Sequence, residues 1–167
     1  VKDREFIGYS YDGADASFEL LARRIIGEIP RYISISEYDV SVKKNSAGKI
    51  ISSAKAHLEV DGEKILCEGE GNGPVNALDN AIRQNVDKLV KYSEYLKDLK
   101  LVDYKVRILN TGTEAVTRVS IESTDSKGKN WFTIGVSTNI IDASFKALVD
   151  SLDYKLFKDN APASKWK

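Results

Sequence analysis

The spacing of apolar residues divides the chain into helix-like and strand-like stretches in a definite order. Residues 15–29 carry apolar side chains at helical spacing, which predicts an amphipathic helix with one buried face made of Phe18, Leu21, Ala22, Ile25 and Ile29. Pro30 directly after this stretch ends the predicted helix.

Three strand-like stretches and a second helix follow. The strands are expected at Tyr32–Lys43, Ile50–Val60 and Lys64–Gly69, separated by turns at Asn45–Gly48 and at Asp61–Gly62. A long helix is expected from Pro74 to Leu96, because proline suits the first helical position. Its predicted apolar stripe consists of Val75, Leu78, Ile82, Leu89 and Leu96.

The same order then recurs. Strands are expected at Leu101–Leu109, Ala115–Glu122 and Asn130–Val136, followed by a helix over Ile140–Phe157. The inward side chains of this last helix are predicted to be Ile141, Phe145, Leu148, Leu152 and Leu156.

A gapless self-match at an offset of 66 residues relates the two halves. Ile35–Val42 aligns with Leu101–Ile108, and the turn and strand-end glycines align as well: Gly62 with Gly128, and Gly69 with Gly135. We therefore predict an α+β fold of two βββα units related by a pseudo-twofold axis and preceded by a linker helix. Two units packed together would bury the apolar sheet face that one unit leaves open.

This organisation predicts the segment boundaries. Residues 1–30 form the linker segment with its helix, 31–160 form one domain with units 31–99 and 100–160, and 161–167 form a tail. The chain starts at Val1 rather than at a methionine, which indicates a piece of a longer protein.

Composition and charge exclude several classes of protein. The 25 Lys and Arg balance the 25 Asp and Glu, and the excess of positive charge typical of proteins that bind nucleic acid or anionic lipid is missing. Apolar runs are too short to cross a bilayer, no secretory signal is recognisable, and the single Cys67 precludes an intrachain disulfide. A cytoplasmic protein without nucleic-acid or membrane partners is expected.

Candidate catalytic and metal-binding residues are scarce. Any nucleophile–histidine arrangement or imidazole metal site would depend on His57, the only histidine, and such metal sites need several donors. We interpret His57 as an ordinary strand residue and Cys67 as an inert thiol. No catalytic residue, metal site or cofactor is therefore predicted in this chain.

The most unusual segment is the glycine-rich junction Gly71–Asn76 between a strand and a helix. Glycines allow close approach of a ligand, and a helix start offers unpaired N–H groups to an anion. The equivalent junction in the second unit has Asn139 as a cap and Asp142 three residues later. Both junctions could equally be tight turns; as a pair they suit a small zwitterion with an aliphatic side chain. The candidate effector-binding residues are Gly71, Asn72, Gly73, Pro74, Val75, Asn76, Ser137, Thr138, Asn139 and Asp142.

Several motifs resemble one family. Gly71-Asn-Gly-Pro-Val-Asn-Ala77 resembles a signature of the C-terminal regulatory domain of 2-isopropylmalate synthases, and Leu101–Tyr104 followed by Gly112 resembles another segment of that domain. Gly135–Lys155 and Tyr11–Arg24 are similar to the citramalate synthase branch. Asn76 departs from the family, which usually has Asp at this position.

The resemblance implies a non-catalytic regulatory domain that forms a homodimer and binds a branched-chain amino acid as feedback inhibitor: isoleucine in citramalate synthases, leucine in isopropylmalate synthases. It also implies a parent enzyme whose catalytic TIM barrel condenses acetyl-CoA with a 2-oxo acid, pyruvate or 2-oxoisovalerate, with the help of a divalent metal. Such a barrel needs roughly 250 residues, more than this chain holds.

A double-stranded-RNA-binding module is the main alternative, because its element order, helix, three strands and helix, matches residues 15–96. That module needs basic residues at the start of its second helix, whereas Gly73–Asn80 is neutral to acidic. A small enzyme with an unfamiliar site is a weaker alternative.

Overall fold

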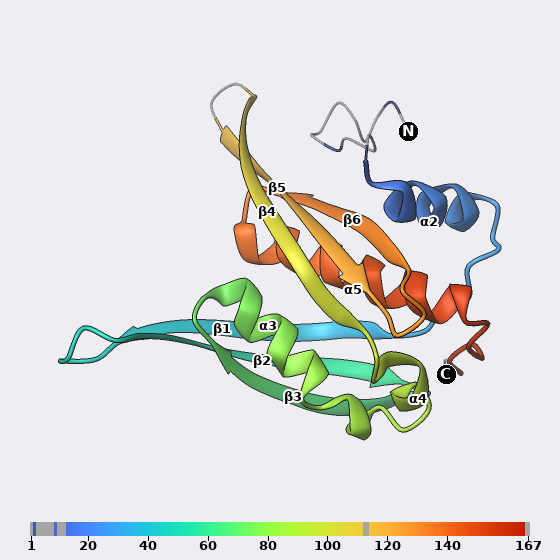
Figure 1. The fold of residues 1–167 in the computed structure, drawn as a ribbon, viewed down its shortest axis with the longest axis horizontal. Coiled ribbons are helices and arrows are strands. Elements are labelled where there is room, and N and C mark those ends of the chain that lie inside the picture. The colour runs from blue at the N-terminus through green and yellow to red at the C-terminus, as the bar shows by residue number, and fades with distance from the viewer. Residues whose placement is uncertain (1, 3–8, 10–12, 112–113, 166–167) are drawn as a thin grey trace. The chain divides into compact units, whose positions relative to one another are not determined.

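The computed structural model describes residues 2, 9, 13–111 and 114–165 (Figure 1). Tyr11 and Gly112, which belong to the resemblance motifs, lie outside this range. The chain forms two compact units: one comprises Val1–Ile29 and Asp98–Lys158, the other Pro30–Lys97 and Asp159–Lys167. They are named the α5 unit and the α3 unit after their main helices.

The α3 unit is a three-stranded antiparallel sheet with one covering helix (Figure 1). The strands β1 (Ser34–Lys44), β2 (Ile50–Val60) and β3 (Glu63–Gly71) pair in sequence order, and α3 (Pro74–Arg83) packs mainly on β3 and β2. The turn between β2 and β3 needs positive φ at both residues, which Asp61 (54°) and Gly62 (80°) supply. The predicted strands and their turns are confirmed.

The long helix predicted from Pro74 to Leu96 is wrong. It is divided into α3, a short 3₁₀ turn at Val86–Lys88 and α4 (Ser93–Leu96). The Asn85 side chain causes the break, because its amide donates to Ala81 O (2.7 Å) and to Glu68 O (2.9 Å) and so competes with the helical backbone. Leu89 and Leu96 are nevertheless fully buried, as their periodicity predicts.

The last described residues of the chain also belong to the α3 unit. Pro162 O accepts a hydrogen bond from the Tyr92 hydroxyl (2.9 Å), and the Ser164 backbone N–H donates to Arg31 O (2.9 Å). The Asp61 N–H donates to Ser164 Oγ (2.6 Å). The C-terminal segment therefore ties the start of the unit to its β2–β3 turn.

The α5 unit repeats this architecture. Its strands β4 (Lys100–Thr111), β5 (Glu114–Thr124) and β6 (Asn130–Ser137) form a second antiparallel sheet, and α5 (Ile140–Lys158) packs on β6 and β5. The predicted helix stripe is confirmed for Phe145, Leu148, Leu152 and Leu156, whereas Ile141 is only half-buried.

The helix α2 (Asp15–Ile25) belongs to the α5 unit, where it lies along β6 and α5. The predicted buried face of this helix is confirmed only at Leu21, since Phe18, Ala22 and Ile25 are exposed, and the helix ends at Ile25 instead of Ile29. The contact face is shifted by one position towards the N-terminus relative to the predicted face. It consists of residues three or four positions apart: Ser17, Leu20, Leu21 and Arg24. Polar anchors at both ends of this face fix the helix rotation.

Irregular backbone features confirm the internal repeat. In each unit the register of the first strand pair shifts at one residue, Ser36 in one and Val102 in the other, which are 66 positions apart. The turn glycines Gly62 and Gly128 both have positive φ, 80° and 72°. The pseudo-twofold relation between the two units stays a prediction.

Small residues in the third strand of each unit allow the covering helix to pack closely. A Cβ on Gly135 would collide with the α5 backbone at Ala143 and Ala147, and one on Gly69 would collide with α3 at Ala81.

Gly135→Ala should therefore destabilise the α5 unit by roughly 1–3 kcal/mol, measured by urea unfolding. Gly73→Ala is the matched control, because Gly73 has open space and φ of −157°. Equal stabilities of the two variants would contradict this packing.

Candidate functional site

Strand β1 carries apolar side chains on the sheet face that α3 only partly covers. By register Tyr38 lies opposite Ala56 and Val42 opposite Ser52, so both point to the helix-covered face of the sheet. Their exposed fractions are nevertheless 39% and 58%, because α3 packs mainly on β2 and β3. Tyr38, Val40 and Val42 are named the β1 strip.

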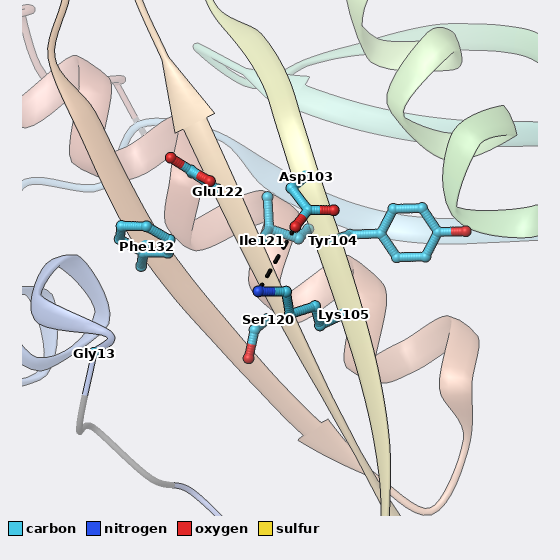
Figure 2. Close-up of a pocket in the computed structure, with 8 residues that line it drawn as sticks. All are labelled: Gly13, Asp103, Tyr104, Lys105, Ser120, Ile121, Glu122 and Phe132. Carbon is cyan, nitrogen blue, oxygen red and sulfur yellow. Dashed lines mark ion pairs between the residues drawn. The ribbon is translucent and has the colours of Figure 1, made fainter.

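Strand β4 has the same feature at the repeat-equivalent positions. Tyr104, Val106 and Ile108, the β4 strip, lie opposite Ile121, Val119 and Thr117, and their exposed fractions are 45%, 38% and 69%. Figure 2 shows the Tyr104 ring directed away from Phe132 and Glu122, which lie on the other side of the sheet. Exposed apolar rows on edge strands mark interaction surfaces.

The junction between β3 and α3 contains six candidate effector residues. Gly71 is required by close packing, because a Cβ there would collide with Asn76 and the Ala77 backbone. The Asn76 side chain folds back and accepts hydrogen bonds from Asn72 N (3.3 Å) and Asn80 Nδ2 (3.5 Å). Gly73 is the N-cap and Pro74 the first helical residue. In the part of the chain that the structure describes, no side chain caps the first turn of α3, and buried Val75 lies beside it.

The junction between β6 and α5 differs in its hydrogen bonds. The predicted Asn139 cap is confirmed, since its Oδ1 accepts from Ile141 N (2.8 Å) and Asp142 N (3.2 Å). Asn139 N donates to Ser137 Oγ (3.2 Å), and the Asp142 carboxylate pairs with Lys146 (2.9 Å). The Asn139 cap occupies the backbone N–H groups of Ile141 and Asp142, which an effector carboxylate would need. The start of α3 is therefore the more accessible of the two helix starts. The two junctions lie in different units, and their joining in one site stays a prediction.

His57 and Cys67 have the surroundings expected of ordinary strand residues. His57 Nδ1 lies 3.0 Å from Glu37 on the neighbouring strand, and Cys67 is buried, which raises the pKa of its thiol. The described residues contain no group of three or more His, Cys, Asp or Glu that could hold a metal ion. Within the same range no helix is long and apolar enough to span a bilayer.

The open sheet face of the α5 unit has a shallow pocket of about 200 Å³ that sequence reasoning missed (Figure 2). Its lining includes Asp103 and Lys105, whose charged groups lie 3.8 Å apart, together with Ser120, Glu122 and Phe132. These five residues alternate with the β4 strip along the strands, so their side chains lie on the opposite face of the sheet. Tyr104 of the strip also lines the pocket, although its ring points away from Phe132 and Glu122.

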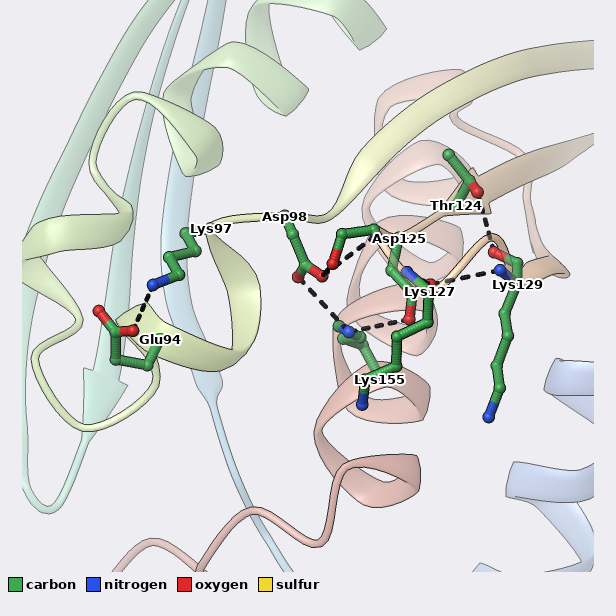
Figure 3. Close-up of polar contacts among 9 residues, drawn as sticks. Glu94, Lys97, Asp98, Thr124, Asp125, Lys127, Lys129 and Lys155 are labelled. Carbon is green, nitrogen blue, oxygen red and sulfur yellow. Dashed lines mark hydrogen bonds and ion pairs between the residues drawn. The ribbon is translucent and has the colours of Figure 1, made fainter.

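A buried lysine joins α5 to two loops of the α5 unit (Figure 3). Lys155 is 2% exposed, and its Nζ lies 2.9 Å from Asp125 and 3.4 Å from Asp98. Asp98 in turn accepts hydrogen bonds from the backbone N–H (3.1 Å) and hydroxyl (2.5 Å) of Ser126. Burial alone would raise the pKa of each carboxyl. The Ser126 hydrogen bonds and the Lys155 ammonium lower the pKa of Asp98, and the ammonium together with the backbone N–H groups of Lys129 and Lys127 lowers that of Asp125. The sequence gives no sign of this, because a lysine near a helix end normally indicates a solvated face.

The helix α2 is attached by a second charge cluster that the sequence did not reveal. Arg24 pairs with Asp150 and with Asp153 of α5, at 2.7 Å in each case. Ser17 Oγ donates to Asp150 (3.0 Å) and accepts from the Ile134 N–H of β6 (2.9 Å). Ser17 and Arg24 lie seven residues apart and therefore on one face of α2, which could have indicated a polar contact. The sequence does not show which residues they contact.

Comparison with known proteins gives a consistent result. A family model described as the LeuA allosteric (dimerisation) domain matches residues 12–156. An (R)-citramalate synthase of Geobacter sulfurreducens is 45% identical over 161 residues, which cover 95% of this chain and 30% of the relative. One from Aquifex aeolicus is 44% identical with the same coverage. A 2-isopropylmalate synthase of Clostridium acetobutylicum is 37% identical over 62% of this chain and 17% of its own length. The chain thus spans about a third of the citramalate synthases it matches.

The lysine cluster generates a stability prediction. Lys155→Met should destabilise the α5 unit by roughly 3–5 kcal/mol in urea unfolding, because it leaves Asp125 and Asp98 without their buried cation. Wild-type stability from this cluster should be present above the ordinary carboxyl pKa and lost as the pH falls through the lowered values. Lys97→Met, which removes an exposed pair with Glu94, is the control and should have no measurable effect. A Lys155 variant as stable as this control would contradict the structural role.

Proposed function

The chain belongs to the family of LeuA allosteric (dimerisation) domains, and we propose that it pairs two copies of a larger synthase and regulates them by binding a branched-chain amino acid. The observation that carries this proposal is the pair of matched apolar strips, one on β1 and one on β4, in a chain whose family match covers nearly its whole length.

The two strips support self-association. Each is an apolar row on an edge strand, and each belongs to a sheet whose single helix leaves that row exposed. Because the rows occur at equivalent positions of a repeat, two copies of the chain can cover each other's rows through a symmetric contact. A homodimer formed through the β1 and β4 strips is therefore the arrangement that we propose.

The start of α3 supports an amino-acid effector. The uncapped N–H groups of its first turn suit a carboxylate, and the Asn76 amide adds no negative charge where the family usually has Asp. Val75, the apolar residue that the sequence suggested for contact with an aliphatic side chain, is buried in the core of the chain and offers an effector little surface. We propose that isoleucine or leucine binds near residues 71–76 and near Ser137, Thr138, Asn139 and Asp142. Isoleucine is the first choice, since the relatives of highest identity described above are citramalate synthases.

The parent enzyme is proposed by similarity to these relatives. It would be a cytoplasmic transferase of amino-acid biosynthesis that condenses acetyl-CoA with pyruvate or 2-oxoisovalerate. The described residues do not fit a metal site, so the divalent metal and acetyl-CoA would bind in a catalytic TIM barrel outside this chain. Effector binding would act by favouring one dimer geometry over another, which is a coupling free energy between two distant sites. The RNA-binding alternative is not favoured by the family match.

Charges placed in the strips test the dimer. Val42→Asp combined with Ile108→Asp should raise the dimer dissociation constant by more than about 100-fold, because burying unpaired carboxylates costs several kcal/mol. Sedimentation equilibrium measures this change. Val90→Asp replaces an isolated apolar residue that is 82% exposed, and it should leave association unchanged. Dimers of undiminished affinity in the double variant would place the interface elsewhere.

Calorimetric titration with isoleucine, leucine and a short RNA duplex tests the effector. Heat is expected with an amino acid only, and heat with RNA only would refute amino-acid sensing.

Gly73→Val should fold, because open space surrounds Gly73, but should weaken binding about tenfold or more by covering the first-turn N–H groups. Ser46→Val, in the exposed β1–β2 turn of the same unit, is the control. Unchanged affinity of the Gly73 variant would remove this junction from the site.

A further inference from the structure

The contact between α2 and α5 concentrates charge at one partly buried place, where the Asp150 and Asp153 side chains are 18% and 13% exposed and that of Arg24 is 37% exposed. A single guanidinium, that of Arg24, bridges two carboxylates that lie about one turn apart on α5: Nη1 to Asp150 and Nη2 to Asp153, each at 2.7 Å. Two negative groups therefore share one positive group, and the ionised cluster carries a net charge of about −1.

One carboxylate oxygen of this cluster finds no hydrogen-bond donor among the described residues. It is Asp153 Oδ1, which is buried, while Oδ2 accepts a hydrogen bond from Arg24. A buried carboxylate oxygen without a donor is costly, and a proton bound there would remove the unbalanced charge.

The titration behaviour of Asp153 agrees with this geometry. Burial raises its pKa, Arg24 of α2 lowers it and Asp150 of α5 raises it again, with a net result of about 7. These are the charged groups that act on Asp153 in the part of the chain that the structure describes; β5 and β6, which also pack on α5, supply none there.

Apolar contacts contribute only part of the attachment of α2. Leu20 and Leu21 are buried, whereas the other large apolar residues of this segment, Phe18, Ile25 and Ile26, are 45%, 69% and 66% exposed. Glu19 pairs with Lys158 of α5 at 2.9 Å, but this pair is partly exposed and adds little. The Arg24 cluster and the Ser17 bridge to Asp150 and β6 therefore decide how firmly α2 is held.

We propose that the α2–α5 contact is a latch that closes on uptake of one proton by the carboxylate of Asp153. In the docked state this group is buried beside Asp150, whereas in an undocked state it is solvated and ionised near pH 7. Because the docked state binds the proton more strongly, docking is favoured below pH 7 and weakens as the pH rises through about 7. The latch goes beyond the proposed function and does not depend on the identity of the parent enzyme or effector.

Hydrogen exchange of the α2 amides in the 167-residue chain tests the latch. After division by the intrinsic exchange rates, protection of α2 should be about tenfold higher at pH 6 than at pH 8. Amides of Val119 and Ile121 in the buried strand β5 serve as the internal reference and should change by less than about twofold. Equal α2 protection at the two pH values would overturn the proposal.

Three variants separate the latch from general stability. Asp153→Asn should abolish the pH response of α2, because the amide is neutral throughout. Asp103→Asn, which removes an exposed carboxylate of the same unit, should retain the tenfold response. Arg24→Gln should lower α2 protection at both pH values while β5 stays protected. A wild-type pH response in Asp153→Asn, or unchanged α2 protection in Arg24→Gln, would contradict the latch.

Discussion

The geometric mismatch between one helix and three strands determines most of what this chain does. A helix is about 10 Å wide and strands lie about 4.8 Å apart, so one helix covers two strands well and leaves the third partly open. In both units the helix lies over the second and third strands, and the first strand, β1 or β4, exposes its apolar row. Duplication of the unit duplicates the exposed row. The partner that we propose is a second copy of the chain, because its surface provides matching rows at matching positions, and a domain built in this way is therefore expected to dimerise.

Local sequence patterns predict the elements of this fold well. The period-two strands, the turn glycines Gly62 and Gly128, and the α5 stripe through Leu148 and Leu152 follow from the sequence, because in each case the local preference and the burial agree. The wrong predictions, those of one long helix after Pro74 and of the buried face of α2, have a common cause. Asn85 breaks a helix through its contact with Glu68, and Ser17 and Arg24 rotate α2 towards partners more than a hundred residues away. Side-chain hydrogen bonds to distant residues leave no periodic signal.

The candidate site shows the same division. The helix starts at Gly73 and Asn139 and the Asn139 cap were predictable, since capping depends on residues within one turn. The uncapped state of α3, with the Asn76 side chain folded back to Asn72, was not predictable, nor were the charge clusters around Lys155 and Arg24. These clusters hold the two elements that flank the α3-unit segment Pro30–Lys97 in the sequence. Asp98 is the first residue after this segment, and α2 is the last helix before it. The proposed effector site, the proposed dimer contacts and the charge clusters thus lie on different parts of one repeated scaffold.

Hydroxyl-radical footprinting of Tyr38 and Tyr104 as a function of protein concentration measures whether the β1 and β4 strips are covered when the chain associates. Both rings are exposed in the single chain, as is Phe132 on the opposite face of its sheet, with exposed fractions of 39%, 45% and 40%. If the β1 and β4 strips form the dimer contact, oxidation of the two tyrosines should fall as the chain associates, while that of Phe132 stays constant. Tyrosines that remain as reactive in the associated protein as in the dilute protein would contradict a dimer contact through these strips.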